Sequence, residues 1–251
     1  MPRFASDSRL VFDLGMNNGD DTEFYLSRGF GVVAVEANPS LCERACERFG
    51  AAIGEGRLSI VNAAIGPKPG DATFFVNRDN DHWSSLDIGW AGREGSRCQE
   101  IAVQCVTLLD LFDEFGVPHY LKIDVEGADQ DVLEQLPGTA LLPLYVSVED
   151  CRFGPRYMEI MSSCGYDGFK LLDQSAVSQM AKTITGHTFP AGSSGPFGGD
   201  VPGRWLAYDD MMASYSTTVR DRQGNRLAPR TRWWDIHCTN IGSAAAHERG
   251  I

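Results

Sequence analysis

The sequence lacks any run of about 20 apolar residues that could cross a membrane, and its first ten residues lack the apolar core of a signal peptide. It also lacks clusters of Lys and Arg. Its 22 basic residues are outnumbered by 34 acidic ones, for a formal net charge of −12 at pH 7. Because nucleic acids and anionic membranes attract clustered positive charge, we expect neither as a partner. We expect a soluble, cytoplasmic protein.

The seven cysteines lack the CxxC spacing of a zinc knuckle, and their odd number and scatter do not indicate a disulfide framework. Cys42 and Cys46 lie one helical turn apart and could form half of a metal site. Buried cysteines acting as small apolar residues are the more ordinary interpretation. The cysteine pattern therefore predicts reduced thiols and no metal site.

The chain of 251 residues fits one α/β domain over residues 1–251, without a second independent domain. Short apolar runs typical of buried strands alternate with helix-like segments, as in a mostly parallel sheet with helices on both faces. The predicted strands are 10–12, 32–35, 58–65, 72–76, 101–106, 120–124, 144–148, 166–172 and 233–238. The predicted helices are 21–28, 39–49, 108–115, 129–136 and 156–164.

Residues 173–230 differ in character from the rest of the chain. They include the glycine- and proline-rich run 192–203, which disfavours regular structure, together with aromatic residues that are able to pack. We interpret the segment as an ordered lid or partner surface inserted before the last strand. A disordered linker is the alternative. Residues 240–251, small and polar from Ala244 onward, are expected to form a frayed tail.

Residues 11–22, VFDLGMNNGDDT, read as a strand, a tight turn and a helix start. Gly15 and Gly19 would allow the backbone to approach a ligand where a Cβ would clash. Asn17 tolerates left-handed conformations better than most residues do. An ordinary strand and turn is the alternative, because a glycine loop alone is a weak motif.

Negative charge in this turn narrows the choice of ligand. Asp13, Asp20 and Asp21 lie where a loop that binds pyrophosphate needs bare N–H groups and a positive helix N-terminus. Such a corner suits a cofactor with a cationic amino-acid end, such as S-adenosylmethionine (AdoMet), better than NAD.

Two further strand ends are candidates for contacts with an adenosine moiety. Glu36 follows the second strand about twenty residues after the glycine turn, where a carboxylate can accept both ribose hydroxyls. A solvated acid or a helix cap is the alternative for Glu36. Asn62 or Ala63, near the end of the third strand, would lie beside the adenine, although Asn62 could equally be a turn former.

Asp124, Glu126 and Glu149 follow later predicted strands, so they would face the same cleft at one edge of a parallel sheet. Clustered acids are costly unless they bind cations, take up protons or pair with a base such as Lys122. His82, in the polar and irregular stretch 77–99, and His187 are further titratable candidates, although each is more often an ordinary loop histidine.

Several sequence blocks taken together resemble the FkbM family of AdoMet-dependent methyltransferases, over roughly residues 9–240. The blocks are VFDLGMNNGDDT at 11–22, VEANP at 35–39, SSL at 84–86, VTLLDL at 106–111, LKIDVEGAD at 121–129, VSVED at 146–150, SSGPFGGD at 193–200 and WWDIHC at 233–238. The resemblance implies a Rossmann-like class I methyltransferase fold with a seven-stranded sheet.

The resemblance also implies roles for individual residues. Asp13, Gly15 and Gly19 would hold the methionine moiety, Glu36 the ribose and the Asn62–Ala63 segment the adenine, with Asp124 where the methyl group is presented. Asn17 and Thr22, from the same loop and helix start, complete the predicted cofactor-binding set. Asn17 stands where related enzymes often have the middle of three alternating glycines, so the backbone contacts of the loop are left open.

The family implies O-methylation of a hydroxyl on a small metabolite, natural product or sugar. An alcohol acceptor needs a base, for which Asp124 is the first choice and Glu126, Glu149, His82 and His187 are further candidates. A divalent metal held by Asp124 with Glu149 or Asp150 is possible but not favoured. Three functional alternatives remain open: N- or carboxyl-methylation, an NAD-dependent oxidoreductase or epimerase, and a non-catalytic AdoMet-binding scaffold. A homodimer is also left open.

Overall fold

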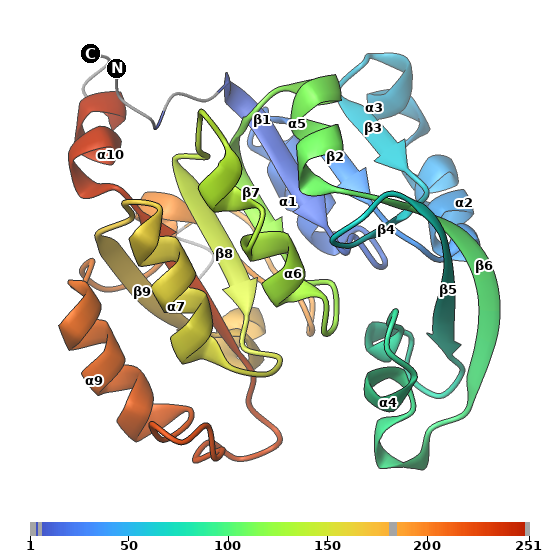
Figure 1. The fold of residues 1–251 in the computed structure, drawn as a ribbon. Helices are drawn as coiled ribbons and strands as arrows, with labels where there is room; N and C mark the ends of the chain where they lie inside the picture. The colour runs from blue at the N-terminus through green and yellow to red at the C-terminus, as the bar shows by residue number, and fades with distance from the viewer. Residues whose placement is uncertain (1–3, 5–6, 181–184, 249–251) are drawn as a thin grey trace.

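The computed structural model describes residues 4, 7–180 and 185–248. Its main sheet has the strand order β3-β2-β1-β7-β8-β10-β9 (Figure 1). The strands are β1 (Asp7–Leu14), β2 (Gly31–Val35), β3 (Leu58–Val61), β7 (Pro118–Ile123), β8 (Tyr145–Glu149), β9 (Gly168–Asp173) and β10 (Trp234–Thr239). The neighbouring strands from β3 to β8 pair in parallel, whereas β10 is antiparallel to both β8 and β9. The predicted, mostly parallel seven-stranded sheet is confirmed.

A second sheet corrects one predicted strand. Residues 58–65 do not form one strand, because the chain leaves the main sheet after β3 and enters a three-stranded sheet as β4 (Ala64–Ile65). The other members are β5 (Gly70–Asn77) and β6 (Cys98–Val106), which pair with each other in antiparallel fashion. The loop between β5 and β6 contains the one-turn helix η1 (Asp81–Trp83), α4 (Ile88–Ala91) and η2 (Arg93–Gly95).

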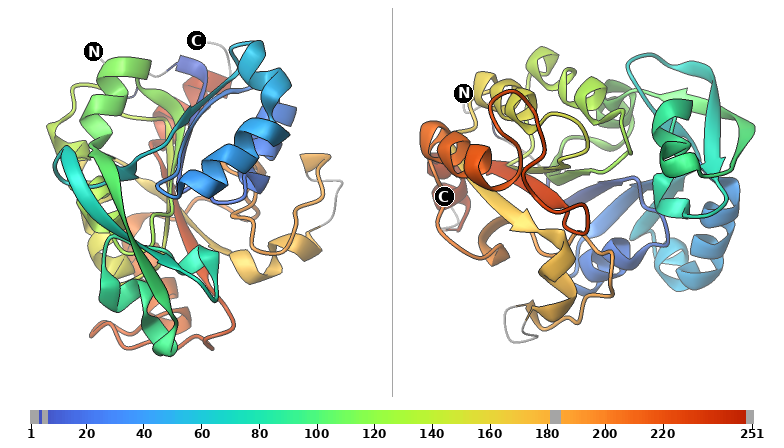
Figure 2. Two further views of the ribbon diagram at one scale, coloured as in Figure 1. Left: turned by 90° about the vertical axis from the view of Figure 1, so that its right-hand side faces the viewer. Right: turned by 90° about the horizontal axis from the view of Figure 1, so that it is seen from below.

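Helices cover both faces of the main sheet, as predicted (Figure 2). One face carries α5 (Leu108–Phe115), α6 (Asp129–Leu133), α7 (Gly154–Ser163) and α9 (Tyr208–Thr218). The other carries α1 (Asp20–Ser27), α2 (Pro39–Arg48), α3 (Gly50–Gly54) and α10 (Ile241–Glu248). Three further short 3₁₀ helices are η3 (Leu136–Gly138), η4 (Gln174–Gln179) and η5 (Gly198–Asp200). In the part of the chain that the structure describes, no helix combines the length and apolarity that crossing a bilayer requires.

The two faces of the sheet have separate apolar clusters because successive strand side chains point to opposite sides. On β1, Phe12 and Leu14 pack beneath α5, α6 and α7, whereas Val11 packs with α1. On β2, Val33 and Val35 pack in the same cluster as Phe12 and Leu14, whereas Val32 and Ala34 pack in the same cluster as Val11. This double burial explains why the strands read as continuous apolar runs.

Local capping places the helices that follow these strands. Asn38 begins α2, because its side chain accepts a hydrogen bond from Ser40 N at 3.1 Å and Pro39 occupies the first turn. Thr107 and Asp110 form a reciprocal capping box at the start of α5. As a result, α2 starts within a few residues of the end of β2, and α5 within a few residues of the end of β6.

The insertion before the last strand is ordered over its described residues and contains an unpredicted helix, α9. Phe197 stacks on Tyr120 of β7 with ring centroids 4.1 Å apart, and Phe189 packs against Phe24 of α1 at 4.8 Å. Figure 2 shows the part of the segment before α9, in gold to light orange, on the same side of the sheet as the first helices, whereas α9 packs on the opposite side. These contacts contradict the linker alternative for the described part; residues 181–184 lie outside it.

The expected frayed tail is also corrected. Residues up to Glu248 form α10, and Ala244 packs into the cluster on the α1 face. Tertiary packing therefore stabilises a segment whose small, polar composition suggested none. Residues 249–251 lie outside the described part of the chain.

Candidate active site

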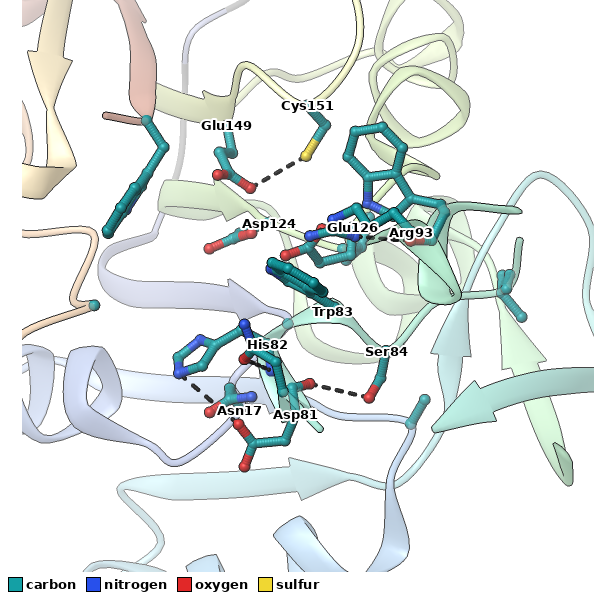
Figure 3. Close-up of a pocket in the computed structure, with 18 of the residues that line it drawn as sticks. Asn17, Asp81, His82, Trp83, Ser84, Arg93, Asp124, Glu126, Glu149 and Cys151 are labelled. Atoms are coloured by element: carbon teal, nitrogen blue, oxygen red, sulfur yellow. Dashed lines mark hydrogen bonds and ion pairs between the residues drawn. The ribbon is translucent and has the colours of Figure 1, made fainter. Parts of the chain in front are cut away.

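A cavity of about 990 Å³ opens at the carboxyl ends of the parallel strands (Figure 3). The residues that follow β1, β2, β7 and β8 meet at this edge because parallel strands end on the same side of a sheet. Of the predicted site residues, the following line it: Gly15, Asn17, Glu36, Ala63, His82, Asp124 and Glu149. Asp13, Gly19, Thr22 and Asn62 do not.

Glu36, directly after β2, has a carboxylate that the backbone holds in place. One oxygen accepts a hydrogen bond from Asn17 N at 2.9 Å and the other accepts one from Asn38 N at 2.8 Å. Burial raises the pKa of Glu36, and these two N–H groups oppose the rise. Each carboxylate oxygen retains a lone pair. Glu36 can therefore accept two further hydroxyl groups from a ligand in the cavity.

Asn62 and Ala63 have different roles: Asn62 holds the neighbouring backbone in place, and Ala63 lines the cavity. The side-chain amide of Asn62 donates to the carbonyls of Glu36, at 2.9 Å, and Ala37, at 3.3 Å. Asn62 thereby holds the chain after β2 and does not face the ligand space, whereas Ala63 lines the cavity.

The two loop glycines are needed for packing within the protein, a reason that sequence analysis did not give. A Cβ on Gly15 would lie 1.8 Å from the backbone oxygen of Asp124, and one on Gly19 would lie 2.6 Å from the Phe49 ring. Both residues have φ near +80°, which other residues rarely adopt. Asn17, at φ 50°, is left-handed as expected. Its buried Oδ1 has no hydrogen-bond partner among the described residues, so the cavity contains an acceptor that a ligand can satisfy.

Asp13 and Thr22 lie behind the loop. Asp13 is fully buried and accepts hydrogen bonds from Thr22 Oγ1 at 2.6 Å and from Lys122 Nζ at 3.0 Å. Lys122 also donates to the carbonyl of Gly15 at 3.1 Å. These contacts hold the loop in place from the side that faces away from the cavity. Neither Asp13 nor Thr22 lines the cavity.

Asp124, Glu126 and Glu149 meet in the cavity, as the sequence predicted. Burial raises the pKa of Glu126 to about 8, with Asp124 adding to the rise and Arg93 opposing it. Burial also raises the pKa of Glu149 well above its ordinary value, and the charges of Asp124 and Glu126 add to that rise. Asp124 Oδ2 lies 3.7 Å from Lys122 Nζ. At neutral pH the site therefore retains protons on carboxyl groups that would be ionised in water.

Glu126 joins the loop after β7 to the loop between β5 and β6. Its Oε2 accepts hydrogen bonds from Trp90 Nε1 at 2.6 Å and from Arg93 at 2.9 Å, while its carbonyl accepts one from Ser85 Oγ at 2.6 Å. The guanidinium of Arg93 lies over the rings of both Trp83, at 4.5 Å, and Trp90, at 4.7 Å. Sequence analysis missed Trp90 and Arg93 individually; the only signal was the aromatic content of residues 77–99.

Only one of the two candidate histidines lines the cavity. His82 lines the cavity and is half-exposed, with Nε2 3.9 Å from Asp81 Oδ1. His187 does not line it; its ring packs against Phe24 at 5.3 Å and Phe189 at 4.9 Å. The structure therefore removes His187 as a candidate base.

The residues that could hold a metal ion in the structure differ from those predicted from the sequence. Asp150 accepts hydrogen bonds from Arg220 Nε at 2.8 Å, Gly154 N at 3.1 Å and the Tyr215 hydroxyl, so it has little capacity left for a cation. Glu126, Glu149 and the unpredicted Cys151 instead place three ligand-type atoms within 4.8 Å of one another. The Cys151 thiol donates to Glu149 at 3.1 Å.

Five arginines line the cavity, and sequence analysis singled out none of them: Arg93, Arg152, Arg220, Arg226 and Arg230. Three of them come from the insertion before β10, as do Ala191 and Gly192. Chain segments far apart in sequence thus build the half of the cavity beyond Asp124.

Comparisons with known proteins give a family match and several weak structural likenesses. No curated protein matches the sequence significantly. The solved structures that resemble it include precorrin-6y C5,15-methyltransferase from Geobacter metallireducens GS-15, with 8% identity, a TM-score of 0.41 and coverage of 93% of this chain and 81% of that one. Another is 1,6-didemethyltoxoflavin-N1-methyltransferase from Burkholderia thailandensis with bound S-adenosylhomocysteine, with 11% identity, a TM-score of 0.38 and coverage of 92% and 71%.

These structural likenesses are weak, and the assignment depends on the sequence of the chain itself. Residues 13–167 match the model of the methyltransferase FkbM domain. That range contains the end of β1 and all of β2 to β8, and with them Glu36, Asp124 and Glu149. The chain belongs to the FkbM family of methyltransferases.

Proposed function

We propose that the protein transfers the methyl group of AdoMet to a hydroxyl of a small metabolite, natural product or sugar. The observation that carries the proposal is one continuous cavity that contains Glu36 at one strand end and Asp124 with Glu149 at two others. A carboxylate suited to ribose hydroxyls and a carboxylate suited to an acceptor proton therefore share one ligand space.

The residues present fit AdoMet. Glu36 has two free lone pairs for the ribose, Ala63 offers a small apolar wall for the adenine, and the free Oδ1 of Asn17 can accept a hydrogen bond near the loop. When bound, AdoMet supplies a methyl group on a sulfonium centre. The protein then has to hold the acceptor oxygen in line with that group and exclude water.

Removing the acceptor proton is the second task. We propose Asp124 as the base, because it lies at the end of β7 in the cavity, beside the loop that Gly15 begins. Its carboxylate Oδ2 lies 3.7 Å from Lys122 Nζ, which also holds the loop at Gly15. Glu149 is a weaker candidate, since burial raises the pKa of its carboxyl group well above the ordinary value and so disfavours the ionised form that a base requires. His82 stands at the half-exposed side of the cavity and is the remaining candidate.

The acceptor would lie between Asp124 and the insertion. Ala191, Gly192 and the arginines after α9 line that part of the cavity, which supports the proposal that residues 173–230 cover the acceptor. The remainder of the insertion packs on the sheet and anchors this cover.

Calorimetry tests the cofactor assignment. Purified, chelator-treated protein is titrated with AdoMet, S-adenosylhomocysteine and NAD, and the titrations are repeated with Mg²⁺. We expect saturable binding of the first two ligands and not of NAD, with no need for the metal ion. Binding of NAD alone, or of none of the three, would contradict the proposal. Turnover on alcohol acceptors but not on matched amines or carboxylic acids would then support O-methylation.

A further inference from the structure

The five arginines that line the cavity differ in how their charges are balanced. Arg93 pairs with Glu126, Arg152 with Asp87, Arg220 with Asp150 and Arg230 with Glu94. Among the described residues, no carboxylate lies within 4.0 Å of Arg226, so this cavity-lining arginine has no counter-ion.

Arg226 also has an unsatisfied donor. Its Nε is buried and donates no hydrogen bond within the described part of the chain, while one terminal nitrogen donates to the carbonyl of Arg232. Buried N–H groups in proteins nearly always have a partner, and a charged donor without one is costly. A carboxylate or phosphate is the group that matches the planar, two-pronged donor set of a guanidinium.

The position of Arg226 increases the need for an anion. An isolated antiparallel backbone bridge pairs Arg226 with Arg220, and both residues line the cavity, so two arginines contribute to the same wall. The carboxylate of Asp150 is committed to Arg220, whose side chain is only 12% exposed. Asp150 also accepts from Tyr215 and Gly154, so it cannot balance a second arginine.

We propose that the acceptor carries a carboxylate or phosphate group, which Arg226 binds in the cavity. The proposal rests on the function proposed above and narrows its acceptor to an anionic hydroxylated molecule. The net charge of −12 repels anions from most of the surface, so a lone unbalanced arginine in the cavity selects for an anion at this place. The Trp233 side chain, which also lines the cavity, offers an apolar surface for the remainder of the molecule.

Two sets of probes test the proposal by binding, without requiring turnover. One consists of glucose, glucuronate and glucose 6-phosphate; the other consists of 4-hydroxybenzyl alcohol, 4-hydroxybenzoate and 4-hydroxyphenyl phosphate. Each is titrated calorimetrically into protein saturated with S-adenosylhomocysteine, and into protein without it. In at least one set we expect an anionic member to bind about 10-fold or more tightly than its neutral partner. The carboxylate and phosphate members show which anion is preferred.

Variants locate the effect. Arg226→Gln should abolish the preference for the anionic probe and leave binding of the neutral partner unchanged, whereas Arg226→Lys should keep part of the preference. Arg222→Gln, an exposed position in the same loop that does not line the cavity, is the matched control and should behave like the wild type. Equal binding of charged and neutral probes to the wild type in both sets would overturn the proposal, as would equal losses in Arg226→Gln and Arg222→Gln.

The two proposals fail separately. If S-adenosylhomocysteine does not bind, the methyltransferase proposal loses its cofactor, yet the cofactor-free titrations still measure the anion preference. If S-adenosylhomocysteine binds and no anion preference is found, only the acceptor inference is contradicted.

Discussion

Glu36 is the residue whose geometry is most nearly complete before any ligand arrives. Two backbone N–H groups fix its carboxylate, and the Asn62 amide fixes the chain that follows it. Because the group is already ordered, ligand hydroxyls can bind it without the cost of immobilising a side chain.

We predict that Glu36→Ala weakens AdoMet binding by about 1.5–3 kcal/mol or more, because hydrogen bonds to a charged acceptor are lost. Isothermal calorimetry measures the change. Glu36→Gln, which retains one acceptor oxygen, separates this loss from loosening of the Asn17 loop and should give an intermediate affinity. Glu47→Ala, at an exposed site on α2, is the control. Unchanged affinity in Glu36→Ala would refute the ribose assignment.

Asp124 is expected to affect turnover more than cofactor affinity. A positioned general base typically contributes about 10²- to 10⁴-fold, so Asp124→Asn should lower kcat by that order and change the Kd for AdoMet little. Single-turnover kinetics and calorimetry provide the two measurements, with the exposed Asp113→Asn as the matched substitution. A variant with a normal rate would leave Glu149 or His82 as the base.

At the scale of elements, the insertion before β10 has two roles in the structure. Residues 185–205 cover a face of the sheet, and the residues after α9 line the cavity. Its aromatic anchors therefore position the cavity wall indirectly.

Phe197→Ala should lower the free energy of unfolding by about 2–4 kcal/mol, because the ring packs against Tyr120 and Tyr25 in the core. Urea denaturation measures the loss. Leu141→Ala, at a side chain that is 42% exposed, should change stability by no more than about 0.5 kcal/mol. A similarly small loss for Phe197→Ala would mean that the segment does not pack on the sheet in solution.

At the scale of the whole molecule, buried acids couple stability to pH. Burial, as the main cause, raises the pKa of the Glu126 carboxyl group from its ordinary value of 4.5 to about 8 in the folded protein. Between these values the folded state binds more protons than the unfolded one, so stability falls as pH rises. Below pH 4.5 this contribution is fully present, and above pH 8 it is lost.

Glu126→Gln mimics the protonated form and retains an oxygen for Trp90 and Arg93. We expect it to be about as stable as the wild type near pH 5 and more stable above pH 8. It should also flatten the fall in stability between these limits, which is at most about 1.4 kcal/mol per pH unit for one group. Urea titrations from pH 5 to 9 compare the two proteins, and parallel curves would contradict the raised pKa.

The sequence by itself determined the order of strands and helices and the edge of the sheet where the site lies. Both follow from local physics: buried parallel strands need continuous apolar runs, and polar residues directly after them must lie at one edge. Glu36, Asp124 and Glu149 were identified on that ground, before any contact was known. The same local reasoning failed at residues 58–65, where a uniform apolar run divides between two sheets.

Tertiary structure alone decided which predicted residues face the ligand and what surrounds them. Asp13, Thr22 and Asn62 were predicted to bind the cofactor, yet they hold the loop and the strand end from behind, because burial and side-chain direction depend on the neighbouring strands. The arginine-lined half of the cavity combines residues more than 100 positions apart, and no local pattern encodes that proximity. The charge balance of Arg226 depends on which carboxylates reach it, and only the folded chain sets those distances.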